Sequence, residues 1–338
     1  MGQTNNFYQS KRILITGGLG FIGSNLAIKL VELGAKVEIV DALIPAYGGN
    51  LFNIESIKNK VKVVKGDIRD KKTVDRLVKD KDIIFNLAGT LSHIDSMTDP
   101  MTDLEINCRA QLSLLESVRK LNPAAKIVFA GTRNQYGKAQ YLPVDENHPQ
   151  EPTDINGINN IAAEKYHLMY TQVYGIKTVS LRMTNTFGPR HQMKHPRQGV
   201  LNWFIRNILD GKKVVLFGDG KQIRDVNYLD DVIAALLLVG QSSNGWGEAY
   251  NLGGIPISLL DFVKNTIEIV KSVQNEVRPR RRIVLRPFPN DRKQIEVGDY
   301  IANWDKMKKT YGWKPEVSIE DGIKKTLEYY SRNKKYYW

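Results

Sequence analysis

Residues 12–23 read RILITGGLGFIG and join a short β-rich run to the start of a helical pattern. Arg12 to Thr16 forms the run, and the helical pattern from Phe21 to Leu33 stops at Gly34, a common helix C-terminal signal. Glycines in such a turn let backbone N–H groups approach a pyrophosphate, and the helix N-terminus adds a favourable dipole. The strand, turn and helix together predict a dinucleotide-binding unit rather than an ordinary tight turn.

The second expected strand, from Lys36 to Val40, ends at Asp41, about 20 residues after the glycines. A carboxylate at this place accepts a hydrogen bond from a ribose 2′-hydroxyl and repels a 2′-phosphate. We therefore expect NAD rather than NADP as the cofactor. The contacts predicted for this first part of the cofactor are Gly17, Gly20, Phe21, Ile22, Gly23 and Asp41.

Apolar runs and helical patterns keep alternating through the first half of the chain. The expected strands cover 61–64, 82–86, 126–130 and 178–181, and the expected helices cover 71–79, 104–121 and 156–174. This order predicts an α/β fold, a doubly wound parallel sheet of the Rossmann-like type. After Arg182 loops rich in Gly, Pro and basic residues appear, which predicts a smaller C-terminal substrate-binding domain at 183–338. The first domain then covers 1–182, with 225–250 returning to it.

Residues 67–68 follow the expected strand 61–64, and residues 87–89 follow the expected strand 82–86. Both segments lie at the carboxyl edge of the sheet, where such folds bind ligands. Asp67 is a candidate acceptor for the adenine amino group, with Ile68 against the ring. Ordinary turns are the alternative interpretation of both segments. Leu87, Ala88, Gly89 and Asn107 are also predicted cofactor contacts.

The glycine spacing, Gly-x-x-Gly-x-x-Gly, and several later motifs resemble the extended short-chain dehydrogenase/reductases, the NAD-dependent nucleotide-sugar epimerases and dehydratases. These motifs are GTRNQYG at 131–137, LRMTNTFGP at 181–189, FGDG at 217–220 with Arg224-Asp225, and GWKP at 312–315. The resemblance runs from about Arg12 to about Pro315 and implies an enzyme that oxidises a sugar hydroxyl with bound NAD. Members of this family use a Ser or Thr and a Tyr-x-x-x-Lys pair, in which the Lys lowers the pKa of the Tyr so that the phenolate acts as general base.

The chain departs from that pattern at two positions. Thr132 fills the Ser/Thr position, but without any gap Asn156 falls at the Tyr position and Asn160 at the Lys position. An amide is no general base near neutral pH, and Asn160 brings no charge, although it can still hydrogen-bond a ribose hydroxyl. The resemblance therefore implies NAD binding more directly than it implies turnover.

His93 follows the fourth expected strand and is the preferred replacement for the missing acid/base group. Histidine is the side chain whose charge changes near neutral pH, which suits it to proton transfer. A hydrogen-bonded loop histidine without a catalytic role is the alternative interpretation.

The resemblance also implies a site for a nucleotide-linked sugar. Asn185 and Arg224 would hold its diphosphate, since the planar fork of Arg suits phosphate oxygens. Val215 to Phe217 would line the slot for the base. The predicted substrate-binding residues are Asn134, Gln135, Asn185, Val215, Phe217, Arg224 and Arg292.

Composition limits the other possibilities. The chain of 338 residues carries a net charge of +13, but its basic residues are scattered and form no basic stripe interleaved with aromatic residues, as single-stranded nucleic-acid binders have. The single cysteine, Cys108, allows no intramolecular disulfide. No apolar run is long enough for a membrane span, no signal peptide is evident and no metal site is indicated, so we expect a soluble cytoplasmic protein.

Three hypotheses follow. The first is an NAD-dependent epimerase, dehydratase or oxidoreductase that acts on a UDP-, dTDP-, CDP- or GDP-linked sugar with unusual acid/base groups. The second is a binding protein on the same scaffold that turns over little, and the third is a nucleic-acid-associated member of the fold. A homodimer through the helices at Leu104–Leu121 and Asn156–Tyr174 is also expected.

Overall fold

A seven-stranded parallel sheet organises the computed structural model, which describes residues 4–45, 47–274, 283–293 and 295–338. Its strand order is β10-β6-β5-β4-β1-β2-β3. The strands are β1 (Arg12–Thr16), β2 (Lys36–Asp41), β3 (Lys62–Lys65), β4 (Ile83–Asn86), β5 (Lys126–Thr132), β6 (Thr178–Met183) and β10 (Ala249–Leu252). The predicted α/β doubly wound sheet is confirmed.

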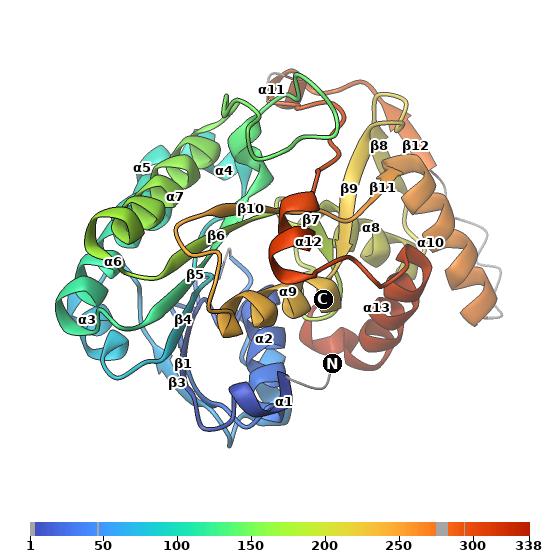
Figure 1. Cartoon of the computed structure of the whole chain (residues 1–338). Coiled ribbons are helices and arrows are strands. Elements are labelled where there is room, and N and C mark those ends of the chain that lie inside the picture. The colour runs from blue at the N-terminus through green and yellow to red at the C-terminus, as the bar shows by residue number, and fades with distance from the viewer. Residues whose placement is uncertain (1–3, 46, 275–282, 294) are drawn as a thin grey trace.

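Helices cover both faces of this sheet (Figure 1). On one face α2 (Phe21–Glu32) and α9 (Leu229–Gln241) pack on Ile13 and Ile15, and α1 (Thr4–Phe7) lies beside them. On the other face Leu14 packs in a second core with α3 (Lys71–Val78), α6 (Ala110–Leu121) and α7 (Ile155–Tyr174). Burial on both sides explains why the strand sequences are apolar throughout rather than alternating.

The strand order reverses at β1, whose neighbours are β2 on one side and β4 on the other. In open parallel sheets this switch point leaves a crevice at the carboxyl ends of the strands, where ligands bind. Around this edge lie α4 (His93–Thr98), α5 (Pro100–Leu104), a π-helical turn (Glu105–Arg109) and 3₁₀ turns at Leu51–Ile57 and Arg133–Tyr136.

A smaller unit follows β6. It contains a three-stranded sheet of β7 (Asn185–Phe187), β9 (Ile223–Tyr228) and β11 (Ile255–Ser258), and a parallel pair of β8 (Val214–Phe217) and β12 (Ile283–Arg286). Its helices are α8 (Val200–Leu209), α10 (Leu259–Gln274), α11 (Asn290–Lys293) and α13 (Ile319–Asn333). Phe187, Leu216 and Phe262 lie at its own apolar core, separate from the cores of the main sheet.

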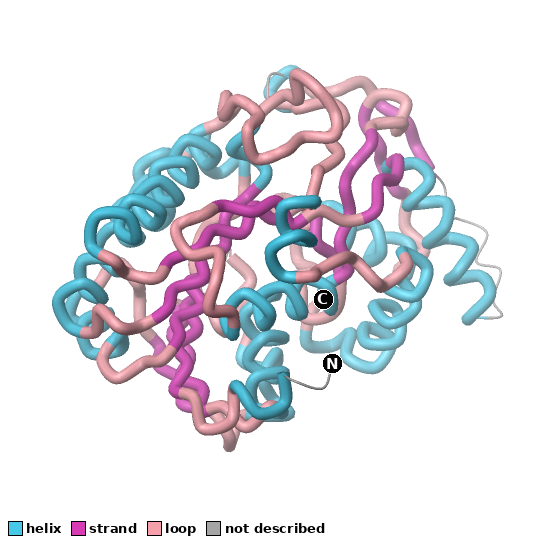
Figure 2. Tube along the Cα trace, in the orientation of Figure 1, coloured by secondary structure: helices cyan, strands magenta, loops and turns pink. Residues whose placement is uncertain are grey.

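Two connections tie this unit to the main sheet. After β9 the chain returns through α9 to β10, which pairs with β6, and α12 (Asp305–Tyr311) packs against β10. At the C-terminus, beyond the 3₁₀ turn Lys334–Tyr336, Tyr337 Oη donates to Asn53 Oδ1 (2.6 Å) and so joins the last residues to the first half of the chain. Figure 2 shows helices packed beside the strands in both parts. Within the described ranges, no helix combines the length and apolar character that crossing a membrane requires.

Candidate active site

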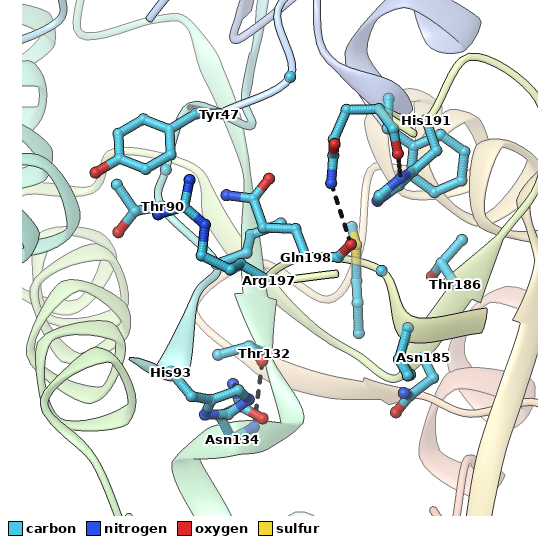
Figure 3. A pocket seen from close by; sticks show the side chains of 18 of the residues that line it. Tyr47, Thr90, His93, Thr132, Asn134, Asn185, Thr186, His191, Arg197 and Gln198 are labelled. Atoms are coloured by element: carbon cyan, nitrogen blue, oxygen red, sulfur yellow. Dashed lines mark hydrogen bonds between the residues drawn. The ribbon is translucent and has the colours of Figure 1, made fainter. Parts of the chain in front are cut away.

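One large cavity of about 1020 Å³ lies between the carboxyl edge of the main sheet and the smaller unit. It is lined by the glycine turn and β2 on one side and by β7, β8 and the 3₁₀ turn after β5 on the other. Figure 3 shows side chains from both parts of the chain pointing into it. All thirteen predicted cofactor residues line this cavity: Gly17, Gly20, Phe21, Ile22, Gly23, Asp41, Asp67, Ile68, Leu87, Ala88, Gly89, Asn107 and Asn160.

The glycine turn brings backbone close to backbone. Gly17 has φ +67, and a Cβ on it would stand 3.0 Å from the Cα of Ala88. A Cβ on Gly23 would stand 2.4 Å from the Gly17 carbonyl oxygen, so the first turn of α2 can approach the loop only without one. The N-terminus of α2 opens into the cavity here, an arrangement suited to a pyrophosphate.

Thr16 joins the turn to the segment after β4. Its Oγ1 accepts from the N–H groups of Leu87 and Ala88, both at 3.0 Å, and donates to Asn86 Oδ1 at 2.9 Å. These bonds fix the two neighbouring loops at the switch point relative to each other.

Asp41 ends β2 at the cavity wall. Its carboxylate accepts from the N–H groups of Leu19 (3.0 Å) and Leu43 (2.9 Å). Burial raises its pKa, and the two backbone donors offset only part of that rise. Each carboxylate oxygen retains a lone pair with which to accept from a ribose hydroxyl.

Asp67 has a cationic neighbour that the sequence analysis did not consider. Arg69 Nη2 lies 2.6 Å from Asp67 Oδ2, and this pairing is the main reason why the pKa of Asp67 is lowered. The carboxylate therefore reaches the cavity already bound to a guanidinium.

The side chain of Asn156 does not line the cavity, unlike that of Asn160. It is fully buried, and its Nδ2 donates to the Thr90 carbonyl oxygen (2.8 Å) and to Asp103 Oδ2 (2.9 Å). Asn107 Nδ2 donates to Oγ1 of the same threonine (2.6 Å), and Asn159 Nδ2 donates to Asp103 Oδ1 (2.8 Å). An amide at 156 thus belongs to a buried polar network that shapes the wall of the cavity.

Asn160 donates through Nδ2 to the backbone carbonyl of Asn156 (2.9 Å) and reaches the cavity. Both amides come from the first turns of α7, on the same helix face.

His93 and Asp154 form a hydrogen-bonded titratable pair at this edge. His93 Nδ1 donates to Asp154 Oδ2, since a carboxylate can only accept. Asp154 also begins α7, because its Oδ1 accepts from the Gly157 N–H at 2.7 Å. Burial would raise the pKa of Asp154, but the hydrogen bond and charge of His93 outweigh it, with help from Gly157 and Arg133, and lower that pKa.

In the neutral ring, Nε2 of His93 is then the acceptor nitrogen, and Asn134 Nδ2 lies 3.1 Å from it. Thr132, whose Oγ1 accepts from the Asn134 N–H at 3.2 Å, stands beside this pair (Figure 3). His93, Thr132 and Asn134 all line the cavity, so the histidine presents a basic nitrogen next to a hydroxyl and an amide.

The predicted substrate residues divide into three groups. Asn134, Asn185, Val215, Phe217 and Arg224 line the cavity. Gln135 does not: it is fully buried and bonds Glu164 and Gln150. The side chain of Arg292 lies outside the part of the chain that the structure describes. Arg224 already pairs with Glu296 Oε1 (2.6 Å) and donates to the Gly298 carbonyl (2.7 Å).

Several cavity residues were not predicted from the sequence. Tyr47 belongs to the loop after β2, and His191 and Gln198 come from the loop before α8 (Figure 3). The Gly48-Gly49 pair beside Tyr47 signals a close approach of backbone, and the Gly-rich basic loop was noted, but neither pattern says which side chain points inward. Among the described residues, no group of three or more His, Cys, Asp or Glu side chains is arranged to hold a metal ion.

Comparisons with known proteins agree with this architecture. A family model described as GDP-mannose 4,6 dehydratase matches residues 14–326. The putative UDP-glucose 4-epimerase of Methanocaldococcus jannaschii is 34% identical over 327 residues, covering 95% of this chain and 99% of that protein.

Two solved structures are similar over nearly the whole chain. UDP-glucose 4-epimerase from Thermotoga maritima, with UDP-glucose, has a TM-score of 0.85 at 31% identity and covers 95% of this chain and 99% of its own. dTDP-glucose 4,6-dehydratase from Streptomyces venezuelae, with NAD bound, has a TM-score of 0.84 at 25% identity and covers 96% and 98%. The resemblance inferred from the motifs is confirmed: the chain belongs to the GDP-mannose 4,6 dehydratase family of nucleotide-sugar epimerases and dehydratases.

Proposed function

We propose that this protein is an NAD-dependent epimerase or dehydratase of a nucleotide-linked sugar that uses His93, held by Asp154, as its acid/base group. The observation that carries the proposal is the His93–Asp154 hydrogen bond at the cavity wall, which leaves the second ring nitrogen beside Thr132 and Asn134. A UDP-, dTDP-, CDP- or GDP-linked sugar fits the class of substrate, with the base against Val215 and Phe217.

The cavity fits the cofactor. The glycine turn leaves a backbone cradle that a Cβ would fill, the N-terminus of α2 faces it, and Asp41 stands at the end of β2. Asn160 would hold a ribose hydroxyl through its amide. When bound, NAD supplies a hydride acceptor for a sugar carbon and later returns the hydride.

The chain's own groups handle the proton. His93 Nε2 accepts the proton of the sugar hydroxyl as the carbon is oxidised, and Asp154 stabilises the imidazolium through Nδ1, as a carboxylate does in other histidine bases. Thr132 and Asn134 orient the same hydroxyl through hydrogen bonds. Once the keto sugar has reacted, His93 returns the proton to the sugar oxygen.

The alternative, a protein that binds NAD and a sugar nucleotide but turns over little, is motivated by the amides at 156 and 160. One experiment separates the two. The purified protein, supplied with NAD, is incubated with UDP-, dTDP-, CDP- and GDP-linked hexoses, and products are followed by anion-exchange chromatography and by absorbance of reduced nicotinamide near 340 nm. The enzyme hypothesis predicts a new sugar nucleotide or a keto product with at least one of them. Tight binding without product or transient reduction across all four groups would favour the binding protein.

We also propose a homodimer. Large apolar side chains are exposed on the outer face of α5, α6 and α7, namely Met101, Leu104, Leu121, Ile158, Val173 and Tyr174. An apolar surface of this kind is typical of a protein interface. The two helices expected to form the seam, α6 and α7, pack side by side and carry three of these residues, Leu121, Val173 and Tyr174, near their C-terminal ends.

A further inference from the structure

Arg133 lies between Thr132 and Asn134 in the chain and is one of the residues that line the same cavity. It is only 8% exposed, and its Nη1 is buried without a hydrogen-bond partner in the described part of the chain. Its Cζ stands 5.2 Å from the ring centroid of Tyr300, which is itself buried, and among the described residues the carboxylates of Glu296 and Asp154 act on it from beyond ion-pair distance.

The guanidinium is charged at neutral pH. Burial, together with the charge of Arg224, lowers the pKa of Arg133 to about 10, which still lies well above neutrality. Burying a charge without a hydrogen-bond acceptor costs folding free energy. Proteins keep such groups where a bound ligand supplies the missing acceptor.

Two other buried arginines at this edge show the contrast. Arg182 Nη2 lies 2.6 Å from Glu164 Oε1, and Arg224 Nη2 lies 2.6 Å from Glu296 Oε1. Both have a carboxylate within ion-pair distance, whereas Arg133 has none among the described residues. The acceptor that Arg133 requires can therefore come from the cavity it lines.

We propose that Arg133 binds a carboxylate on the sugar, so that the substrate class is a nucleotide-linked sugar acid. This inference rests on the proposed function, because the proposed function places the sugar of the substrate at the end of the cavity where Arg133 lies. Arg133 lies at this end because its chain neighbours are Thr132 and Asn134, which line the cavity, and Asn134 Nδ2 contacts Nε2 of His93. A guanidinium can pair a carboxylate through two parallel hydrogen bonds, which gives discrimination against the neutral sugar. Diphosphate oxygens present the same chemistry, and the test separates the two sources.

The test measures dissociation constants by calorimetry for the full chain supplied with NAD. The probes are matched pairs, UDP-glucuronate with UDP-glucose and GDP-mannuronate with GDP-mannose, and UDP and GDP alone. For at least one pair the acid is expected to bind about tenfold or more tightly than the neutral sugar. In Arg133→Met that ratio falls to about one, while UDP and GDP bind as before. Lys138→Met, which removes one exposed positive charge nearby, keeps the wild-type ratio.

A stability measurement tests whether Arg133 has only a structural role. Because Arg133 lacks an acceptor without ligand, the Tm of unliganded Arg133→Met should equal or exceed that of the wild type. A fall of several degrees with loss of NAD binding would contradict the proposal. Arg133→Lys then serves as the second variant: a weaker acid preference with unchanged neutral-sugar binding supports it, and an unchanged preference contradicts it.

The remaining outcomes are also decisive. Equal wild-type affinity for acid and neutral sugar overturns the inference and leaves the proposed function standing. Equal weakening of UDP, neutral sugar and acid in Arg133→Met assigns the guanidinium to the diphosphate and also overturns it. Absence of binding by every sugar nucleotide and by NAD removes the proposed function itself.

Discussion

At the scale of single residues, the proposed acid/base group lies on a different element from that of the family pattern. The pattern places a Tyr and a Lys on the helix that is α7 here, where this chain has Asn156 and Asn160. His93 approaches the same cavity from α4 and is hydrogen-bonded to Asp154, the residue that begins α7. The proton-transfer role can therefore be kept although both family residues are replaced.

Asp41 gives a test of cofactor choice at this scale. Asp41→Asn keeps the size of the side chain but removes the charge that would repel a 2′-phosphate. We expect NADH to bind about tenfold more weakly and NADPH to bind as well as or better than to the wild type, measured by nicotinamide fluorescence. An unchanged ratio of the two affinities would contradict the role of Asp41. Asp82→Asn, a change of the same kind away from the cavity, serves as the control.

The sequence located cavity residues correctly where backbone geometry fixes their position. The glycine turn and the strand ends were located because β–α junctions in a parallel sheet all meet at one edge. Gln135 was expected to face the sugar, yet it turns inward to Glu164. Asp154 was not selected at all, because an Asp before a helix is ordinarily just a cap and its contact with His93 spans 61 residues.

At the scale of elements, α7 is fixed to the cavity wall by its polar first turns. Asn156 donates to the Thr90 carbonyl and to Asp103, both of them buried. Asn156→Ala removes one of the two donors from each of these acceptors, which keep their bonds from Asn107 and Thr90, and should lower the free energy of unfolding by about 1–3 kcal/mol. Chemical denaturation measures this. Lys165→Ala, an exposed change on the same helix, should alter it by less than about 0.5 kcal/mol. Equal effects of the two substitutions would show that the network is not stabilising.

The pH dependence of stability is also set by buried elements. Burial lowers the pKa of His167, in α7, to about 4, and the same cause lowers that of His191 to about 4. The unfolded chain takes up protons near pH 6.5 while the folded chain does not, so stability falls as the pH drops from about 6.5 towards 4.

We expect each of these histidines to remove roughly 2 kcal/mol of unfolding free energy between pH 7 and pH 5. Urea denaturation at both pH values checks this, and His167→Gln should reduce the loss by about half. A wild-type protein as stable at pH 5 as at pH 7 would contradict the assignment of both rings as buried and neutral.

Helix boundaries show where local pattern fails. The helix expected at 104–121 divides into α5, a π-helical turn over Glu105–Arg109 and α6. The turn carries Asn107, which bonds Thr90 at the cavity wall. Apolar periodicity cannot report such an irregularity, because the extra residue is accommodated by a tertiary contact.

At the scale of the whole molecule, the strands of the parallel sheet were predictable, whereas the strands of the smaller unit, expected only as a C-terminal domain at 183–338, were not. Strand runs such as RILIT are apolar and are separated by long helices, which is a distinct pattern. The strands of the smaller unit are short and partly exposed, as in β11 with the burial of only Ser258, and they pair with strands distant in the chain. Their pairing is decided by tertiary packing, which local sequence does not record.

The proposed dimer is tested at this scale as well. Val173→Asp places a charge on an exposed apolar side chain of α7 that is 62% accessible in one chain. We expect the wild type to have the mass of a dimer by light scattering after size exclusion, and Val173→Asp to shift the population towards monomer without changing the Tm of the monomer. Lys325→Asp, on the far helix α13, should leave the mass unchanged. A monomeric wild type at micromolar concentration would contradict the proposal.

The most direct test of the account is the turnover of His93→Gln on whichever sugar nucleotide the wild type converts. The amide retains a hydrogen-bonding side chain but cannot accept the proton, so we predict a rate lower by about 10²–10⁴, with NAD affinity within twofold of the wild type. A His93→Gln enzyme that keeps its rate within about threefold would show that another group transfers the proton, and the central claim would be wrong.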